Sequence, residues 1–269
     1  MMEQIKKYTW GAEDYAANSS FQFGLAKELI SKLSLTGSEN VLDIGCGDGK
    51  ITAEIAQHVS GGSILGIDSS EKMISLARNS YGPEKYPNLS FEIMDAREII
   101  LPNKFDVVFS NAALHWIRGH FPVLKGIWNC LNPGGKILLQ MGGKGNAASI
   151  IGVIDEMMNN NKWNEFFKVF EFPYGFYSDK IYNSWLKESG FENRRVELIP
   201  KDMVYPDKKG LAAWIRTTWL PYLERIPTNL HEEFIDELIN IYCTKNPPDN
   251  EAKIHVAMMR LEVEAYKPN

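Results

Sequence analysis

The chain has 269 residues, of which 44% are hydrophobic, enough for one large α/β domain or one domain that carries an insertion. Its net charge is -5 and no cluster of Lys and Arg stands out, which argues against nucleic acid as a partner. No run approaches the roughly 18 apolar residues of a membrane span, and residues 1–10 lack the apolar core of a secretion signal.

The three cysteines, Cys46, Cys130 and Cys243, lie far apart with no paired spacing. This pattern is not that of a disulfide framework or a zinc site, and it favours a reducing compartment. We therefore expect a cytoplasmic protein without a bound metal.

Short runs rich in β-branched residues alternate with helical patterns through the first 141 residues. We expect strands at residues 40–44, 63–67, 90–94, 105–110 and 136–141, and helices at 21–33, 50–58, 70–79 and 121–131. The letters NPGGK after Leu131 predict a helix stop and a tight turn. Strand–helix alternation predicts a parallel sheet with helices on both faces.

The pattern changes after residue 141. Residues 149–190 and 208–243 are predicted to be mainly helical, with two late strands at 194–199 and 257–265. Aromatic side chains crowd residues 163–185. Two interpretations are open for them: they fill the core of a small helical cap, or they line the wall of a pocket.

The first strand runs directly into a glycine-rich loop, residues 41–50, VLDIGCGDGK. A dinucleotide-binding loop has the spacing G-x-G-x-x-G, but here Gly45, Gly47 and Gly49 put the third glycine one residue early. Asp43 precedes the loop, and its carboxylate would repel a pyrophosphate but attract an ammonium group. The loop therefore predicts a ligand with a positive group.

Acidic side chains also follow the next two strands. Asp68 lies about 20 residues past the loop, where an acid can accept hydrogen bonds from both hydroxyls of a ribose. Ser69 or Ser70 is expected to cap the following helix. Asp95 ends the third strand and can accept from an exocyclic amine such as that of adenine. A nucleoside with a cationic amino-acid tail, S-adenosylmethionine (SAM), fits this set.

The chain resembles the class I SAM-dependent methyltransferases. The segments VLDIGCGDGK, GIDSSEKMISLAR, FEIMDA, FDVVFSNAALHWI and LNPGGKILLQM occur in that family's order and spacing, within residues 40–141. The resemblance implies these cofactor-binding residues: Asp43, Gly45, Cys46 (a small filler residue) and Gly47 at the methionine end, Asp68, Ser69 and Met73 near the ribose, Asp95 and Ala96 at the adenine, and Asn111 beneath the sulfonium.

The resemblance also implies the architecture. We expect an α/β fold of the Rossmann-like class I methyltransferase type: a doubly wound, mostly parallel seven-stranded sheet with a helical cap. Residues 1–144 would form the SAM-binding core. Residues 145–254 would form a mainly helical cap inserted around a late sheet strand near 193–200. Residues 255–269 would supply the last, antiparallel strand.

Within the family, SNAALHW after the fourth strand, followed by an aromatic cap, looks like the trans-aconitate and juvenile-hormone-acid methyltransferase branch. Enzymes of that branch methylate carboxylates of small molecules. A glutamine on the first helix and a tryptophan after the fourth strand hold the acceptor there, and Gln22 and Trp116 match those positions. Either residue can equally be a packing residue.

Several alternatives remain open. A carboxylate is already deprotonated at neutral pH and needs no base, whereas N-, O- or C-methylation of another metabolite would need one, with His115 or His120 as candidates. Arg216 is a candidate anchor for a substrate acid, and its alternative interpretation is a surface ion pair. A non-catalytic SAM-binding protein and a nicotinamide-dependent oxidoreductase are further alternatives.

The leading hypothesis is a small-molecule methyltransferase. It would use SAM, release S-adenosylhomocysteine and require no metal. We expect neither nucleic acid nor membrane as a partner, and a monomer or a homodimer.

Overall fold

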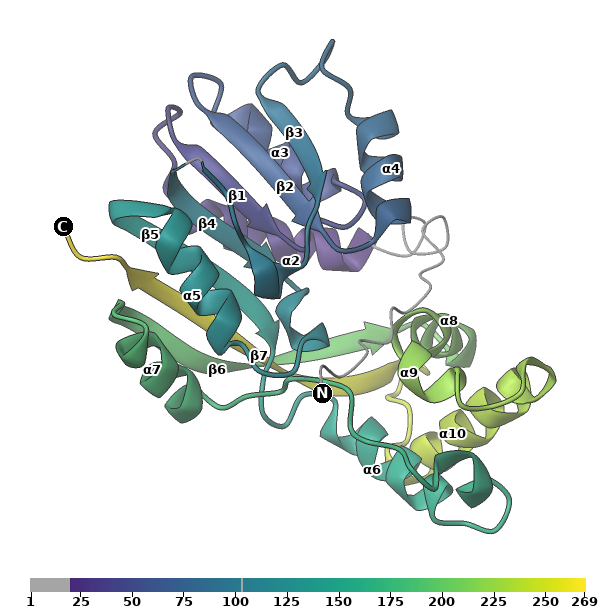
Figure 1. The fold of residues 1–269 in the computed structure, drawn as a ribbon. Coiled ribbons are helices and arrows are strands. Elements are labelled where there is room, and N and C mark those ends of the chain that lie inside the picture. The colour runs from purple at the N-terminus through teal and green to yellow at the C-terminus, as the bar shows by residue number, and fades with distance from the viewer. Residues whose placement is uncertain (1–19, 103) are drawn as a thin grey trace. The chain divides into compact units, whose positions relative to one another are not determined.

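The computed structural model describes residues 20–102 and 104–269, with side chains from residue 26 onward. Its seven strands form one sheet in the order β3-β2-β1-β4-β5-β7-β6 (Figure 1). Strands β1 to β5 run parallel to one another, and β7 runs antiparallel to β5. The strands are β1 Asn40–Ile44, β2 Ser63–Asp68, β3 Leu89–Ile93, β4 Phe105–Asn111, β5 Leu131–Gly142, β6 Glu192–Tyr205 and β7 Ile254–Tyr266.

This architecture confirms the predicted Rossmann-like sheet and its antiparallel last strand. The expected strand bounds agree with the structure within two residues for the first four strands. Strand β5 begins at Leu131, five residues earlier than expected, because the NPGG segment is counted within it. The late strands β6 and β7 are also longer than their apolar runs predicted.

Helices cover both faces of the sheet. They are α2 Ser20–Ser31, α3 Lys50–His58 and α4 Glu71–Ser80 on one face, and α5 Phe121–Cys130 and α7 Asp179–Glu188 on the other. Ser70 caps α4 by accepting a hydrogen bond from the Met73 N–H, and Ser178 caps α7 in the same way through Ile181. These caps fix where the two helices begin.

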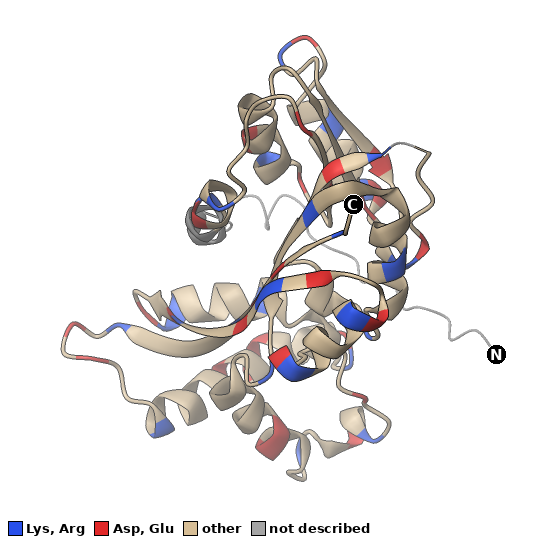
Figure 2. Ribbon diagram, turned by 90° about the vertical axis from the view of Figure 1, so that its left-hand side faces the viewer, with Lys and Arg blue, Asp and Glu red and all other residues tan. Residues whose placement is uncertain are grey.

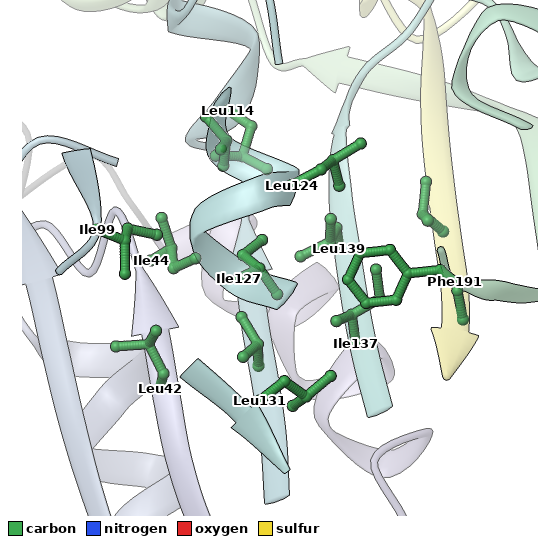
Figure 3. Packing of buried hydrophobic residues seen from close by; sticks show 14 of the residues in the cluster. Leu42, Ile44, Ile99, Leu114, Leu124, Ile127, Leu131, Ile137, Leu139 and Phe191 are labelled. Atoms are coloured by element: carbon green, nitrogen blue, oxygen red, sulfur yellow. The ribbon is translucent and has the colours of Figure 1, made fainter. Parts of the chain in front are cut away.

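Alternating strand residues divide the apolar core into two clusters. On one face Val41, Ile64 and Phe109 pack against α2, α3 and α4. On the other, Ile127 of α5 points toward the branched side chains of the sheet, among them Ile44 and Leu139 (Figure 3). Successive strand side chains point to opposite faces, so each cluster takes every second residue. The central strands are therefore covered on both faces, and the polar side chains of a binding site are expected at the ends of the strands.

The chain divides into two compact units. The sheet unit contains residues 20–146 as far as described, 174–200 and 259–269; the helical unit contains residues 147–173 and 201–258. The expected cap, residues 145–254, was thus drawn too wide. Helix α7 belongs to the sheet unit because Tyr182 and Leu186 pack in the core cluster of α5.

The helical unit has its own aromatic core. It consists of α6 Ala148–Met158, α8 Lys208–Thr218, α9 Leu220–Leu223, α10 His231–Lys245 and the short 3₁₀ helices η3 Asn164–Phe167 and η4 Thr228–Leu230. The Trp163 and Phe234 rings meet edge to face with centroids 5.1 Å apart, and Phe170 lies 4.6 Å from Tyr222. For residues 163–172, the core-filling interpretation of the aromatic stretch therefore agrees with these contacts.

The surface carries charges of both signs along the same helices and strands (Figure 2). None of the helices in the described part of the chain combines the length and the apolar character needed to cross a bilayer.

A buried ion cluster ties α2 to the late strands of the sheet. The Glu262 side chain on β7 is 1% exposed, and its carboxylate accepts hydrogen bonds from Lys32 of α2, Arg195 of β6 and Gln140 of β5. Burial alone would raise the pKa of Glu262, but these donors hold it below its usual value. The cluster joins residues 230 positions apart and fixes α2 against the sheet.

We expect Glu262→Gln to lower the free energy of unfolding by about 2 kcal/mol, because it leaves Lys32 and Arg195 without their shared carboxylate. The partial exposure of both cations keeps the loss at the lower end of the usual range. Urea denaturation would measure it. Glu54→Gln is the control. It removes the partner of Lys27, a carboxylate that is more exposed than Glu262, and should lower the free energy of unfolding by less than about 1 kcal/mol. Equal losses in both variants would contradict a special role for Glu262.

Candidate active site

The turn after β1 uses a backbone conformation that few residues other than glycine adopt. Gly45, Gly47 and Gly49 have φ angles of +74°, +56° and +81°. The N–H groups of Gly45 and Cys46 donate to the carbonyl oxygen of Ile67, at 2.8 and 3.0 Å. These bonds hold the turn against the end of the neighbouring strand β2.

Each glycine of this turn is needed, or left free of a side chain, for a different structural reason. A Cβ on Gly45 would collide with the Cβ of Ala113, so Gly45 allows the loop after β4 to approach. A Cβ on Gly49 would lie 2.6 Å from the Phe91 ring, so Gly49 is required for packing. A Cβ on Gly47 would meet no atom within 4 Å. Gly47 is therefore the glycine at which a ligand can approach the backbone.

Asp68, the last residue of β2, lies against this loop. Its Oδ2 accepts from the Gly47 N–H at 3.0 Å, and its Oδ1 accepts from the Ser70 N–H at 2.8 Å. Burial raises the pKa of Asp68 in spite of these two donors. Ser69 is exposed beside it, while Met73 is buried on the first turn of α4. The structure thus brings the predicted ribose-end residues to the predicted methionine-end loop.

Asp43 is the second acid of the site and is 2% exposed. Its Oδ2 accepts a hydrogen bond from the Thr52 hydroxyl at 2.7 Å. Burial, opposed by this bond and reinforced by the nearby charge of Asp68, raises the pKa of Asp43 to about 7. The sequence analysis did not identify Thr52 as a site residue. The only feature in the sequence that pointed to it is a hydroxyl on the buried side of the helix that follows the loop.

Cys46 occupies the loop as a packing residue. Its side chain is 7% exposed and lies against Gly66, where a Cβ would come within 3.0 Å of the sulfur. Burial and then the charge of Asp43 raise the pKa of the Cys46 thiol well above its usual value. The predicted role of a small filler agrees with this environment.

Asp95 and Ala96 follow β3 at the same edge of the sheet. The Met94 N–H donates to the Asp68 carbonyl at 3.0 Å, which keeps the two strand ends together. The Asp95 Oδ1 accepts from both the backbone N–H and the Nε of Arg97, at 2.9 Å each. Arg97 therefore orients the carboxylate that was predicted to meet the adenine amine.

The end of β4 lies between β1 and β5. Ser110 donates to the carbonyl of Ile44 at 2.7 Å, directly before the glycine loop. Asn111 pairs in register with Gln140, and Ala112 takes the left-handed conformation with φ +55° while its N–H donates to the Gln140 carbonyl. This turn delivers Asn111 and the following helix η2, Leu114–Trp116, to the edge where Gly47 and Asp68 lie.

An aromatic group surrounds η2 within the sheet unit. The Trp116 ring contacts Tyr174 edge to face at 5.1 Å, and Tyr174 stacks on Phe176 at 5.1 Å with an interplanar angle of 6°. The Gly175 N–H donates to the His115 carbonyl at 2.8 Å, which fixes this strap beside η2. Tyr174 and Phe176 thus pack around η2 within the sheet unit, apart from the aromatic core of the helical unit.

The two histidines near η2 are held neutral. His115 Nδ1 accepts from the Gly142 N–H at 3.3 Å, and burial followed by the charge of Arg260 lowers the pKa of His115 to about 3. His120 bonds through one ring nitrogen to the Tyr182 hydroxyl and through the other to the Ile117 carbonyl. Burial lowers the pKa of His120 to about 4. Neither environment is that of a general base at neutral pH.

Two predicted acceptor residues have different outcomes. Gln22 lies in α2, but its side chain is outside the described residues. Arg216 lies in the helical unit and forms a bidentate ion pair with Glu232, at 2.9 and 2.7 Å. This ion pair agrees with the surface ion-pair interpretation of Arg216 and argues against a role as a substrate anchor. Among the described residues, no group of three His, Cys, Asp or Glu side chains could hold a metal ion.

Comparison with known proteins agrees with this geometry. Residues 35–190 match the model of a family described as a methyltransferase domain. The chain belongs to this family. The match covers more than half of the chain and includes the glycine loop, Asp68, Asp95 and η2.

Relatives define the branch of this methyltransferase. An uncharacterized methyltransferase of Schizosaccharomyces pombe is 34% identical, over 77% of this chain and 79% of its own. The juvenile hormone acid O-methyltransferase of Drosophila melanogaster is 28% identical (78% and 73% covered), and the trans-aconitate 2-methyltransferase of Variovorax paradoxus is 25% identical (90% and 92%). These relatives place the enzyme in the class I SAM-dependent methyltransferases and in the branch that its sequence resembles.

A solved structure shares the fold. Phosphoethanolamine N-methyltransferase 2 of Haemonchus contortus, bound to S-adenosylhomocysteine, superposes with a TM-score of 0.62 at 21% identity, covering 96% of this chain and 57% of that one. The residues of this methyltransferase fit SAM: Gly47 leaves room for a ligand at the backbone, and two neighbouring acids, Asp43 and Asp68, favour a cationic one.

The raised pKa of Asp43 predicts a pH-dependent effect of Asp43→Asn. A carboxyl whose pKa is higher in the folded protein stabilises the fold at low pH, and this contribution is lost as pH rises from about 4 to about 7. The variant has no such loss. Its free energy of unfolding should therefore rise relative to wild type by about 2–3 kcal/mol between pH 5 and pH 8.

Urea denaturation of both proteins without ligand, at pH 5 and pH 8, would measure this difference. Glu71→Gln, at an exposed acid on the first turn of α4, is the control and should show no such change. A difference between Asp43→Asn and wild type that does not vary with pH would contradict a buried, proton-binding Asp43.

Proposed function

We propose that this enzyme transfers the methyl group of SAM to a carboxylate oxygen of a small organic acid, without a metal. The observation that carries the proposal is the state of the two histidines beside η2. His115 and His120 are buried and both have lowered pKa values; both ring nitrogens of His120 and the Nδ1 of His115 are hydrogen-bonded to neighbouring groups. An acceptor that arrives already deprotonated needs no base, and a carboxylate meets that condition.

The chain's contribution to such a reaction is positioning. SAM supplies an electrophilic methyl group on a sulfonium, and attack by a carboxylate brings an anion to a cation, so charge is lost in the transition state. A site with few waters favours that loss of charge. The packed rings of Trp116, Tyr174 and Phe176 are apolar groups that we propose for this purpose.

Neutral donors suit the acceptor carboxylate better than cations do. The indole N–H of Trp116 and the amide of Gln22 are proposed to orient it without neutralising its charge. A cationic side chain bound to the reacting oxygen would reduce the nucleophilicity of that oxygen. The same proposal assigns Asp43, Gly45, Gly47, Asp68, Asp95 and Asn111 to the cofactor, with Cys46, Ser69, Met73 and Ala96 as packing neighbours.

The lowered pKa of His115 disfavours the alternative of N-, O- or C-methylation with His115 as base. We further propose a small-molecule acceptor and no nucleic-acid partner, which the mixed surface charges support (Figure 2). All three cysteines are unpaired, in keeping with the proposed cytoplasmic location.

Asp68→Ala should weaken SAM binding about 5- to 150-fold, because it removes the proposed ribose acceptor and the partner of the Gly47 N–H. Isothermal titration with SAM and with S-adenosylhomocysteine measures it. Glu71→Ala, on the same edge but exposed, should bind both ligands as the wild type does. Unchanged affinity in Asp68→Ala would remove Asp68 from the cofactor site.

Trp116→Phe should leave SAM affinity nearly unchanged and reduce turnover about tenfold, because it removes the indole N–H and keeps an aromatic ring. Transfer of labelled methyl groups from SAM to a panel of small carboxylic acids, with trans-aconitate included, provides the assay. Trp128→Phe, on α5 against Phe191, controls for loss of a tryptophan as such. An equal loss of SAM affinity and turnover in Trp116→Phe would show that Trp116 only packs.

A further inference from the structure

Arg97 makes a planar, two-pronged contact with Asp95 at the carboxyl end of β3. Its Nε donates to the Asp95 Oδ1 at 2.9 Å and its Nη2 donates to Oδ2, so one guanidinium holds both carboxylate oxygens. The backbone N–H of Arg97 also donates to Oδ1, because Asp95 is the N-cap of the 3₁₀ helix η1, Ala96–Glu98. Three donors from one residue therefore fix both the position and the plane of this carboxylate.

The segment that carries this pair is anchored within the sheet unit on both sides. Before it, the Met94 N–H donates to the Asp68 carbonyl at 3.0 Å, which ties the end of β3 to the end of β2. After it, Ile99 is 6% exposed in the core cluster, and a Cβ on Gly126 of α5 would lie only 2.9 Å from the Ile99 Cβ (Figure 3). The pair therefore has a fixed place beside the acid that is proposed to bind the ribose.

Stability alone is a weak reason for such a contact. The Asp95 and Arg97 side chains are 27% and 26% exposed, and an ion pair with that access to water stabilises a fold only slightly. A carboxylate has about four acceptor positions, so a pair with Arg97 does not by itself exclude a ligand amine as a further donor. The contact is better suited to hold the carboxylate ready for a ligand.

We propose that Arg97 is a positioning residue for recognition of the adenine base. It acts through Asp95, whose carboxylate it holds in the orientation that accepts a hydrogen bond from the exocyclic amine. This proposal rests on the assignment of Asp95 to the cofactor within the proposed function. A carboxylate that is already fixed loses little rotational freedom when the base binds, so more of the hydrogen bond's free energy contributes to affinity.

Two ligands that differ only in the amine test this proposal. One is S-adenosylhomocysteine, and the other is its purine analogue, which carries a hydrogen in place of the exocyclic amine. In isothermal titration the wild type should bind S-adenosylhomocysteine about tenfold more tightly. Arg97→Met should reduce this ratio about 3- to 10-fold, because it weakens binding of S-adenosylhomocysteine and leaves the purine analogue nearly unaffected.

A conservative variant and a matched control accompany the measurement. Arg97→Lys keeps the charge but not the planar fork, so its ratio should lie between those of the wild type and Arg97→Met. If Arg97→Met does not fold, Arg97→Lys decides by a reduced ratio. Arg194→Met, at an arginine whose side chain is 70% exposed on β6, is the control and should keep the wild-type ratio. A wild-type ratio in Arg97→Met, or an equal loss of affinity for both ligands, would overturn the proposal.

Asp95→Ala separates this proposal from the cofactor assignment beneath it. This variant lacks the carboxylate, so its ratio should fall at least as far as that of Arg97→Met. If Asp95→Ala keeps the wild-type ratio, or if the wild type binds both ligands equally, the assignment of Asp95 to the adenine fails and the role of Arg97 fails with it. If Asp95→Ala lowers the ratio and Arg97→Met does not, only the role of Arg97 fails.

Discussion

The attachment of the glycine turn to the end of β2 is the constraint on which the site depends. The N–H groups of Gly45 and Cys46 share the Ile67 carbonyl, and the next N–H, that of Gly47, donates to Asp68. Three consecutive backbone donors thus close the gap between two parallel strands. Because the turn is held in this way, Gly47 faces open space and the two acids come together without a ligand to organise them.

Acidic and basic side chains lie at different places along the carboxyl ends of the strands. At the β1–β2 end, Asp43 is buried, and the charge of the nearby Asp68 raises its cost of ionisation further, which a cationic ligand would relieve. At the β4–β5 end, the histidines are neutral, the walls are aromatic and Arg260 supplies positive charge. A cationic methyl donor would meet the acidic end, and the proposed carboxylate acceptor would meet the other.

Most of the sheet unit was predictable because its signals are local. Period-two burial, helix caps such as Ser70 and the spacing of Gly45, Gly47 and Asp68 are properties of short segments. They gave the order of the α-helices and strands from α2 to β5. The extent of the cap was not predictable in the same way. Residues 174–200 belong with the sheet because Tyr182 and Leu186 pack against α5, a contact between segments more than fifty residues apart.

The sequence by itself determined the family, the parallel sheet and the acids at its edge, since strand ends and glycine conformations follow from neighbouring residues. Only the tertiary structure decided the protonation of the side chains. Burial and the charge of Asp68 raise the pKa of Asp43 against the hydrogen bond from Thr52, and burial followed by the charge of Arg260 lowers the pKa of His115. It also showed that Arg216 forms an ion pair with Glu232. The reason is that burial and charge depend on residues brought together from distant strands, and a spacing pattern carries no record of them.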